Sequence, residues 1–279
     1  MLKAILHGKA GRIEHNKDDS VSWSQLFKAR EDLLTSTIFE RFAYLSDEVQ
    51  RTLLDHWFKL HHGFIPESFG EFLDITYWQR FSHEHDEGTN QVEPDLILHF
   101  DQCDIIVEVK PPAGGNQYFG QWYKEIESFL QAEEDSHKSL YFLAIGRIEQ
   151  ADAARWAKRL LSKQQQLKGI AALKWDAVTT QLLQLLGEQS ECELSKQDAR
   201  IIQDMLDGLS LYGQQTSPFK WAELTHSNFP NLSLNHPLLR TEVNPITEQE
   251  DDSSTELEEL TQAFTSLDLP RFQSALKEQ

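Results

Sequence analysis

The chain has 279 residues, of which 39% are hydrophobic and 25% are charged, so it is long and apolar enough to bury a sizeable core. Its apolar runs fall short of the roughly 18 residues that cross a bilayer, and its first residues turn polar too early for a signal peptide, so we expect a cytoplasmic protein without membrane association. The formal net charge of −19 disfavours a free-standing protein with high affinity for a polyanion.

The spacing of apolar residues and the positions of glycine and proline predict the secondary structure. A long helical segment over 26–61 contains no glycine or proline and is ended by Gly63 and Pro66. In chain order there follow a strand over 73–81, a polar loop over 82–91, strands over 95–100 and 104–110, a helix over 117–132, a strand over 139–145, a helix over 152–167 and a strand over 170–175. Helices over 178–187 and 195–211 come next, then loops to about residue 243 and a short amphipathic piece over 257–267.

This alternation of helices and strands, with one hairpin among the strands, predicts an α/β fold with a mixed central sheet flanked by helices. We expect three parts: a core domain over 1–176, a helical and loop extension over 177–243, and an acidic flexible tail over 244–279. The tail carries nine acidic and two basic residues, a net charge of −7, which is typical of a solvated segment.

Three charged residues of the two central strands are expected to converge. Glu108 and Lys110 are two residues apart in one strand, so they project from the same face. A two-residue turn at 101–102 places Asp95 directly opposite Glu108. Directly opposed residues of a hairpin have Cβ atoms about 4.5–5.5 Å apart, so two carboxylates and one ammonium group meet at this point.

Opposed carboxylates repel each other, and a bound cation offsets that repulsion. Carboxylates suit hard divalent ions, and Mg²⁺ typically binds one or two of them together with waters and a substrate phosphate. The alternative is an exposed, salt-bridged strand face, but the apolar run over 105–107 beside Glu108 is typical of a strand buried on both faces. We therefore expect Mg²⁺, with Mn²⁺ as a substitute, at Asp95 and Glu108, and Lys110 beside the attacking water.

The pattern Pro94-Asp95, then an apolar strand, then Glu108-Val109-Lys110 resembles the motif of the PD-(D/E)XK nuclease superfamily. The predicted order of elements over about residues 30–176 is similar to the αβββαβ core of its restriction-endonuclease-like fold. The resemblance implies that Asp95 and Glu108 bind metal and that Lys110 assists the attacking water. It also implies a glutamate on the first core helix near the metal, for which Glu40 is the candidate, and a catalytic glutamine on the helix after Lys110, for which Gln121 is the candidate.

By this resemblance the protein is expected to be a Mg²⁺-dependent deoxyribonuclease that hydrolyses DNA phosphodiester bonds. The acidity favours a subunit of a larger prokaryotic complex, in antiphage defence or a mobile element, in which a protein partner supplies DNA affinity or specificity. The alternative is a catalytically silent module of the same fold that acts in protein assembly. A further hypothesis is that the acidic run from Glu248 to Glu259 covers the site and restrains cleavage.

One predicted helix is basic, although the chain as a whole is acidic. Lys158, Arg159, Lys163 and Lys168 form a basic stripe on and just beyond the helix over 152–167. A solvated helix face is the ordinary explanation of such a stripe, and a contact with a DNA backbone is the functional one.

Overall fold

The computed structural model of the protein describes residues 2–16, 19–28, 30–85, 88–113, 115–134, 136–187 and 193–217. The expected loops from residue 218 to about 243, the acidic tail over 244–279 and the short amphipathic piece over 257–267 lie outside these residues. Within the described ranges, no helix combines the length and the apolar character that a membrane crossing needs.

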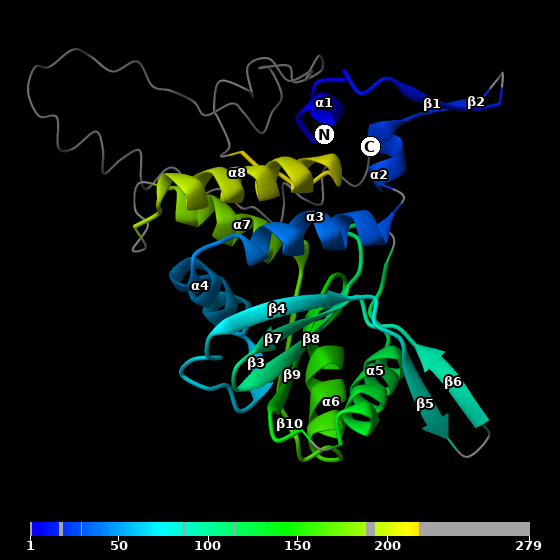
Figure 1. The fold of residues 1–279 in the computed structure, drawn as a ribbon, viewed down its shortest axis with the longest axis vertical. Helices are drawn as coiled ribbons and strands as arrows, with labels where there is room; N and C mark the ends of the chain where they lie inside the picture. The colour runs from blue at the N-terminus through cyan, green and yellow to red at the C-terminus, as the bar shows by residue number, and fades with distance from the viewer. Residues whose placement is uncertain are drawn as a thin grey trace, which may run out of the picture. The chain divides into compact units, whose positions relative to one another are not determined.

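A six-stranded mixed sheet forms the centre of the fold (Figure 1). Its strands lie in the order β3-β10-β9-β8-β7-β4, with the bounds β3 His61–Gly63, β4 Phe72–Tyr77, β7 Leu96–Phe100, β8 Cys103–Val109, β9 Ser139–Ile145 and β10 Leu167–Leu173. Strands β8, β9 and β10 are parallel to one another, whereas β4, β7 and β8 form an antiparallel meander and β3 pairs antiparallel with β10. The predicted α/β class with a mixed central sheet is confirmed.

Helices cover both faces of this sheet (Figure 1). Helices α5 (Phe119–Ala132) and α6 (Gln150–Leu161) pack on one face. The other face is covered by α3 (Glu31–Ala43), α4 (Asp47–Trp57) and α7 (Trp175–Leu186), and α8 (Lys196–Leu211) packs on α3 and α7. Strand alternation explains the two cores, because Ile105 and Val107 of β8 point into one and Ile106 points into the other.

The long helix predicted over 26–61 is wrong, because this span contains the end of α2, then α3 and α4 as separate helices with a break at 44–46, and reaches the first residue of β3. Ser46 is the N-cap residue of α4 and has an extended backbone, and its backbone N–H and hydroxyl both donate to the buried carboxylate of Asp198 on α8 rather than to α4 itself. Asp198 is 152 residues further along the chain, so the spacing of apolar residues over 26–61 does not predict this contact between Ser46 and Asp198.

The polar loop predicted over 82–91 is also wrong. Strands β5 (Phe81–His85) and β6 (Gly88–Val92), which follow β4 and precede β7 in the chain, form a separate two-stranded sheet outside the central one (Figure 1). The residues of β6 are mostly exposed on both faces, so its sequence lacks the alternation of apolar and polar residues by which a strand is predicted. The strand predicted over 73–81 ends at Tyr77, since Trp78 adopts a positive φ of 49° that turns the chain.

The N-terminal elements and the short edge strand β3 were not predicted. The N-terminal part consists of α1 (Leu2–Leu6), a hairpin of β1 (Arg12–Asn16) and β2 (Asp19–Ser22), and α2 (Trp23–Lys28). The helices predicted over 178–187 and 195–211 are confirmed as α7 and α8. These helices pack directly on the central core, with Val178, Leu182, Ile202 and Met205 fully buried in it.

Candidate functional site

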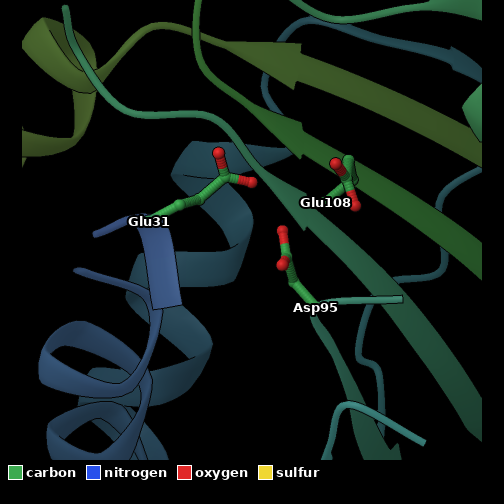
Figure 2. Close-up of side chains that lie close together, drawn as sticks. All are labelled: Glu31, Asp95 and Glu108. Carbon is green, nitrogen blue, oxygen red and sulfur yellow. The ribbon is translucent and has the colours of Figure 1, made fainter. Parts of the chain in front are cut away.

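The β7–β8 hairpin brings Asp95 and Glu108 together. Its register pairs Leu96 with Val107, and the two strands are joined by the two residues 101–102, as predicted. Asp95 immediately precedes β7 and Glu108 is the next-to-last residue of β8, so the same register sets them opposite each other. Both are buried, Glu108 to 1% exposure, and their carboxylates point toward each other (Figure 2).

A third carboxylate comes from Glu31, the first residue of α3 (Figure 2). Glu31, Asp95 and Glu108 can each offer one oxygen, and these oxygens lie within 4.8 Å of one another. The expectation that Glu40 supplies this carboxylate is therefore corrected: Glu40 is exposed and does not belong to the group. The two glutamates are nine positions apart, which on an α-helix is about 13 Å of rise and about half a turn of rotation, so they face opposite ways.

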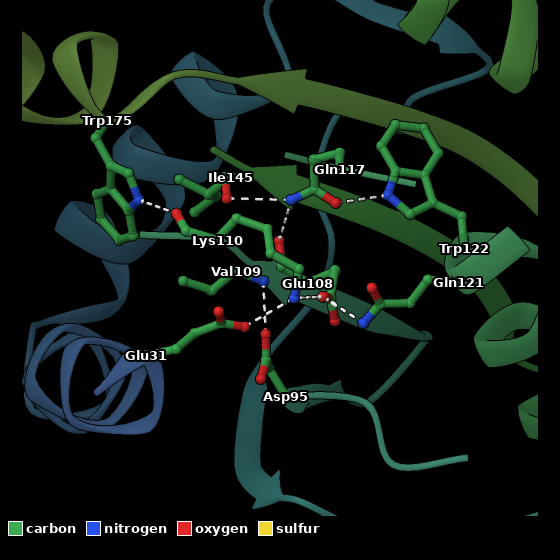
Figure 3. A network of polar contacts seen from close by, with 10 residues as sticks. All are labelled: Glu31, Asp95, Glu108, Val109, Lys110, Gln117, Gln121, Trp122, Ile145 and Trp175. Atoms are coloured by element: carbon green, nitrogen blue, oxygen red, sulfur yellow. Dashed lines mark hydrogen bonds and ion pairs between the residues drawn. The ribbon is translucent and has the colours of Figure 1, made fainter. Parts of the chain in front are cut away.

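Lys110 lies among these carboxylates (Figure 3). Its Nζ is 2.5 Å from Glu108 Oε1 and 2.7 Å from Glu31 Oε1. Burial disfavours the ammonium form, but the two carboxylates outweigh it and hold the pKa of Lys110 above its ordinary value. A cation thus already fills part of the space that the acidic group surrounds.

The backbone at Lys110 is held from three sides. Its N–H donates to the carbonyl of Ile145 at 2.8 Å, and its own carbonyl accepts from the indole N–H of Trp175 at 2.8 Å. Gly146 has φ +146°, and a Cβ there would lie 2.8 Å from Lys110 Cβ. Only glycine allows the chain just after β9 to pass so close to the base of this side chain.

The predicted glutamine Gln121 reaches the site from the first turn of α5. Its Nε2 donates to Glu108 Oε1 at 2.5 Å. Behind it, the buried amide of Gln117 donates to the carbonyls of Glu108 and Ile145 and accepts from Trp122 Nε1 at 2.8 Å. These bonds tie the start of α5 to the ends of β8 and β9 (Figure 3).

Glu125, one helical turn after Gln121, is a site residue that the sequence analysis missed. It is 1% exposed, and its carboxyl and that of Glu108 hydrogen-bond to each other when one of them carries a proton. Burial raises the pKa of Glu125 to about 8, and burial followed by the charge of Glu125 raises the pKa of Glu108. The i, i+4 spacing from Gln121 was the available indication, since it puts both side chains on one helix face.

Asp95 is also held in an environment that favours its protonated form. Burial, then the charge of Glu108, raises the pKa of Asp95 to about 8, although the N–H of Val109 donates to Asp95 Oδ2 at 2.7 Å and Lys110 lies nearby. A bound divalent cation would reverse this balance by favouring the ionised carboxylates.

These pKa values predict how the stability of the metal-free protein depends on pH. In the unfolded chain Asp95 loses its proton near pH 4, whereas in the folded protein it keeps it to about pH 8, so the folded state binds more protons across this window. The melting temperature in EDTA should therefore fall as the pH rises from about 5 to about 8. Asp95→Asn should flatten this dependence, while the exposed control Asp176→Asn should not; an equally steep curve for Asp95→Asn would contradict the assignment.

The donor set fits a hard divalent cation. Three carboxylates converge, Asp95 from just before β7, Glu108 from β8 and Glu31 from α3. Glu108 Oε2 is buried with no hydrogen-bond partner among the described residues unless a carboxyl is protonated. Oxygen donors of this kind suit Mg²⁺ and Mn²⁺, and no cysteine or histidine belongs to the group as described. Glu31, Asp95 and Glu108 are the residues that could hold the ion.

The fold and site together define an α/β protein with a carboxylate–lysine centre at the end of a central hairpin. No protein-family model matches the chain. An uncharacterized protein of Pasteurella multocida (strain Pm70) is 28% identical over 247 residues, which cover 82% of this chain and 86% of that protein. That relative has no stated function, so the function proposed for this chain has to come from its own site.

Proposed function

We propose that the protein is a Mg²⁺-dependent nuclease that hydrolyses DNA phosphodiester bonds. The observation that carries the proposal is the convergence of Asp95, Glu108 and Glu31 around Lys110, with oxygens within 4.8 Å of one another. This is the arrangement expected from the resemblance to the PD-(D/E)XK nucleases, with Glu31 in the place first assigned to Glu40.

In this proposal the three carboxylates hold the cation, which when bound supplies polarisation of the phosphate and a lower pKa for a bound water. Lys110 hydrogen-bonds the attacking water and balances the charge that develops on the phosphate. Gln121 keeps Glu108 oriented through its 2.5 Å hydrogen bond, and Asp95 is oriented by the N–H of Val109. The site thus contributes positioned charges rather than a covalent nucleophile.

The net charge of −19 supports the further proposal that the nuclease works as a subunit of a prokaryotic complex, in antiphage defence or a mobile element, whose protein partner supplies affinity or specificity for DNA.

Cleavage assays with purified protein test the function directly. We expect linear or circular DNA to be cut with Mg²⁺ or Mn²⁺ and to remain intact with EDTA. Asp95→Asn should abolish this cleavage, whereas Asp176→Asn, the same change at an exposed position, should leave it unaltered. Cleavage by Asp95→Asn at the unmodified rate would refute the assignment, and intact DNA under every condition would favour the catalytically silent assembly module.

A further inference from the structure

A basic surface runs along α6 and the loop that follows it. Residues 147–168 carry six basic residues and two acidic ones, a net charge of +4 within a chain of net −19. All six cations are exposed: Arg147, Arg155, Lys158, Arg159, Lys163 and Lys168. Among the described residues, Arg155 alone of these six forms an ion pair, with Asp152.

Three of these cations lie on one face of α6. Helical spacing puts Arg155, Lys158 and Arg159 on the solvent face of α6, while Ala153, Ala157 and Leu160 face the core. Like charges three and four residues apart repel each other and destabilise a helix. Lys158 and Arg159 form no ion pair among the described residues, so this face can bind an anionic ligand.

Two of the cations are held in place by aromatic rings of α5. Arg159 lies over the ring of Phe119 at 4.6 Å, and Lys163 lies over the ring of Tyr123 at 5.3 Å. The two rings are four residues apart on α5 and the two cations are four residues apart along the chain, so the two cation–ring pairs follow one another along α5. Helix α6 lies beside α5 (Figure 1). Cation–π contacts of this kind restrict the side chains while leaving their charge available to solvent.

This row begins in the turn of α5 that also carries Gln121. Phe119 precedes Gln121 by two residues, and Gln121 bonds Glu108. The exposed Arg147 is fixed to the same place, because its carbonyl accepts the backbone N–H of Gln117 at 3.1 Å. Tyr118, at the start of α5, has 61% of its surface exposed and offers a ring on which a base can stack.

We propose that this surface, formed by Arg147, the α5 rings Phe119 and Tyr123, and the cations Arg155 to Lys168, binds the phosphodiester backbone of a nucleic acid and leads it to Glu108. The inference rests on the proposed nuclease function and identifies where its substrate lies. A nucleic acid fits better than an acidic protein, because evenly spaced phosphates match a row of cations and a base can stack on the exposed ring of Tyr118.

Binding can be measured separately from cleavage, by fluorescence anisotropy of labelled single-stranded DNA, duplex DNA and single-stranded RNA with the full chain in EDTA. The test variant is Arg159→Glu with Lys163→Glu. The matched control is Arg51→Glu with Lys59→Glu, which makes the same charge change at two exposed cations of α4 and its end. A milder variant, Arg159→Gln with Lys163→Gln, keeps the test valid if charge reversal disturbs folding.

We expect the test variant to weaken binding of at least one nucleic acid by about tenfold or more relative to the control. In the glutamine variant, the slope of log affinity against log salt should fall by about 2, one for each phosphate that is no longer neutralised by a cation. The tightest of the three probes identifies the nucleic acid.

Three results would overturn the inference. The first is no nucleic-acid binding by the unmodified chain at about 100 μM, and the second is an equal loss of binding in the test and control variants. The third is that the test variant loses binding of polyglutamate while its binding of nucleic acid is unchanged. The proposed function fails in a different way. In that case binding that depends on Arg159 and Lys163 persists, but no metal-dependent cleavage accompanies it.

Discussion

Lys110→Ala is expected to lower the rate of Mg²⁺-dependent DNA cleavage by about 10²- to 10⁴-fold, the range typical for removal of a group that handles a proton in the transition state. The Nζ atom of Lys110 lies 2.5 Å from Glu108 Oε1 and 2.7 Å from Glu31 Oε1. Its ammonium group is therefore next to the position where the proposed cation, water and phosphate would bind. Cleavage kinetics at saturating metal measure the loss.

Two comparisons separate this effect from a damaged fold. Removing Lys110 leaves Glu31 and Glu108 without their cation, so the thermal melting of the variant should depend more steeply on Mg²⁺ than that of the unmodified protein. Lys59→Ala, at an exposed position, should change neither cleavage nor melting. A variant that folds normally and still cleaves at the unmodified rate would remove Lys110 from the mechanism.

Trp122→Ala is expected to cause the largest loss of stability, about 3–5 kcal/mol of the free energy of unfolding. Trp122 is fully buried on α5 and packs against Phe142 at 5.1 Å and Trp156 at 5.2 Å between ring centroids. Its indole N–H also donates to Gln117, whose amide ties α5 to the carbonyls of Glu108 and Ile145. Urea denaturation followed by circular dichroism measures the change.

Trp122→Phe is the control for the hydrogen bond alone. It keeps most of the ring packing but leaves Gln117 Oε1 without its donor, which costs about 1–3 kcal/mol. We expect its destabilisation to fall between those of the unmodified protein and Trp122→Ala, with reduced cleavage if Gln117 positions Glu108. A cost below about 1 kcal/mol for Trp122→Ala would mean that α5 is not anchored through this residue.

The hairpin at the centre of the site could be predicted because its determinants are local. The apolar runs over 96–100 and 103–109 identify two buried strands, and two intervening residues set their register. Once the register is known, strand alternation alone puts Asp95 opposite Glu108. Gln121 was expected only from the resemblance to the nuclease superfamily, and the structure places it in the first turn of the helix that follows Lys110.

The carboxylates of Glu31 and Glu125 could not be predicted in this way. Glu31 and Glu40 lie on the same helix, and choosing between them requires the rotation of α3 about its axis, which is set by packing against the sheet and α8. The role of Glu125 depends on how deeply α5 is buried beside β8, because a glutamate on an exposed helix face would have an ordinary pKa.

The sequence by itself determined the α/β class, the register of the β7–β8 hairpin and the meeting of Asp95, Glu108 and Lys110, since these follow from apolar periodicity and the fixed geometry of strands. Only the tertiary structure decided the break before α4, the choice of Glu31, the burial of Glu125 and the row of cations over the rings of α5. Each of these depends on contacts between segments far apart in the chain, and such contacts leave no periodic pattern in the residues on either side.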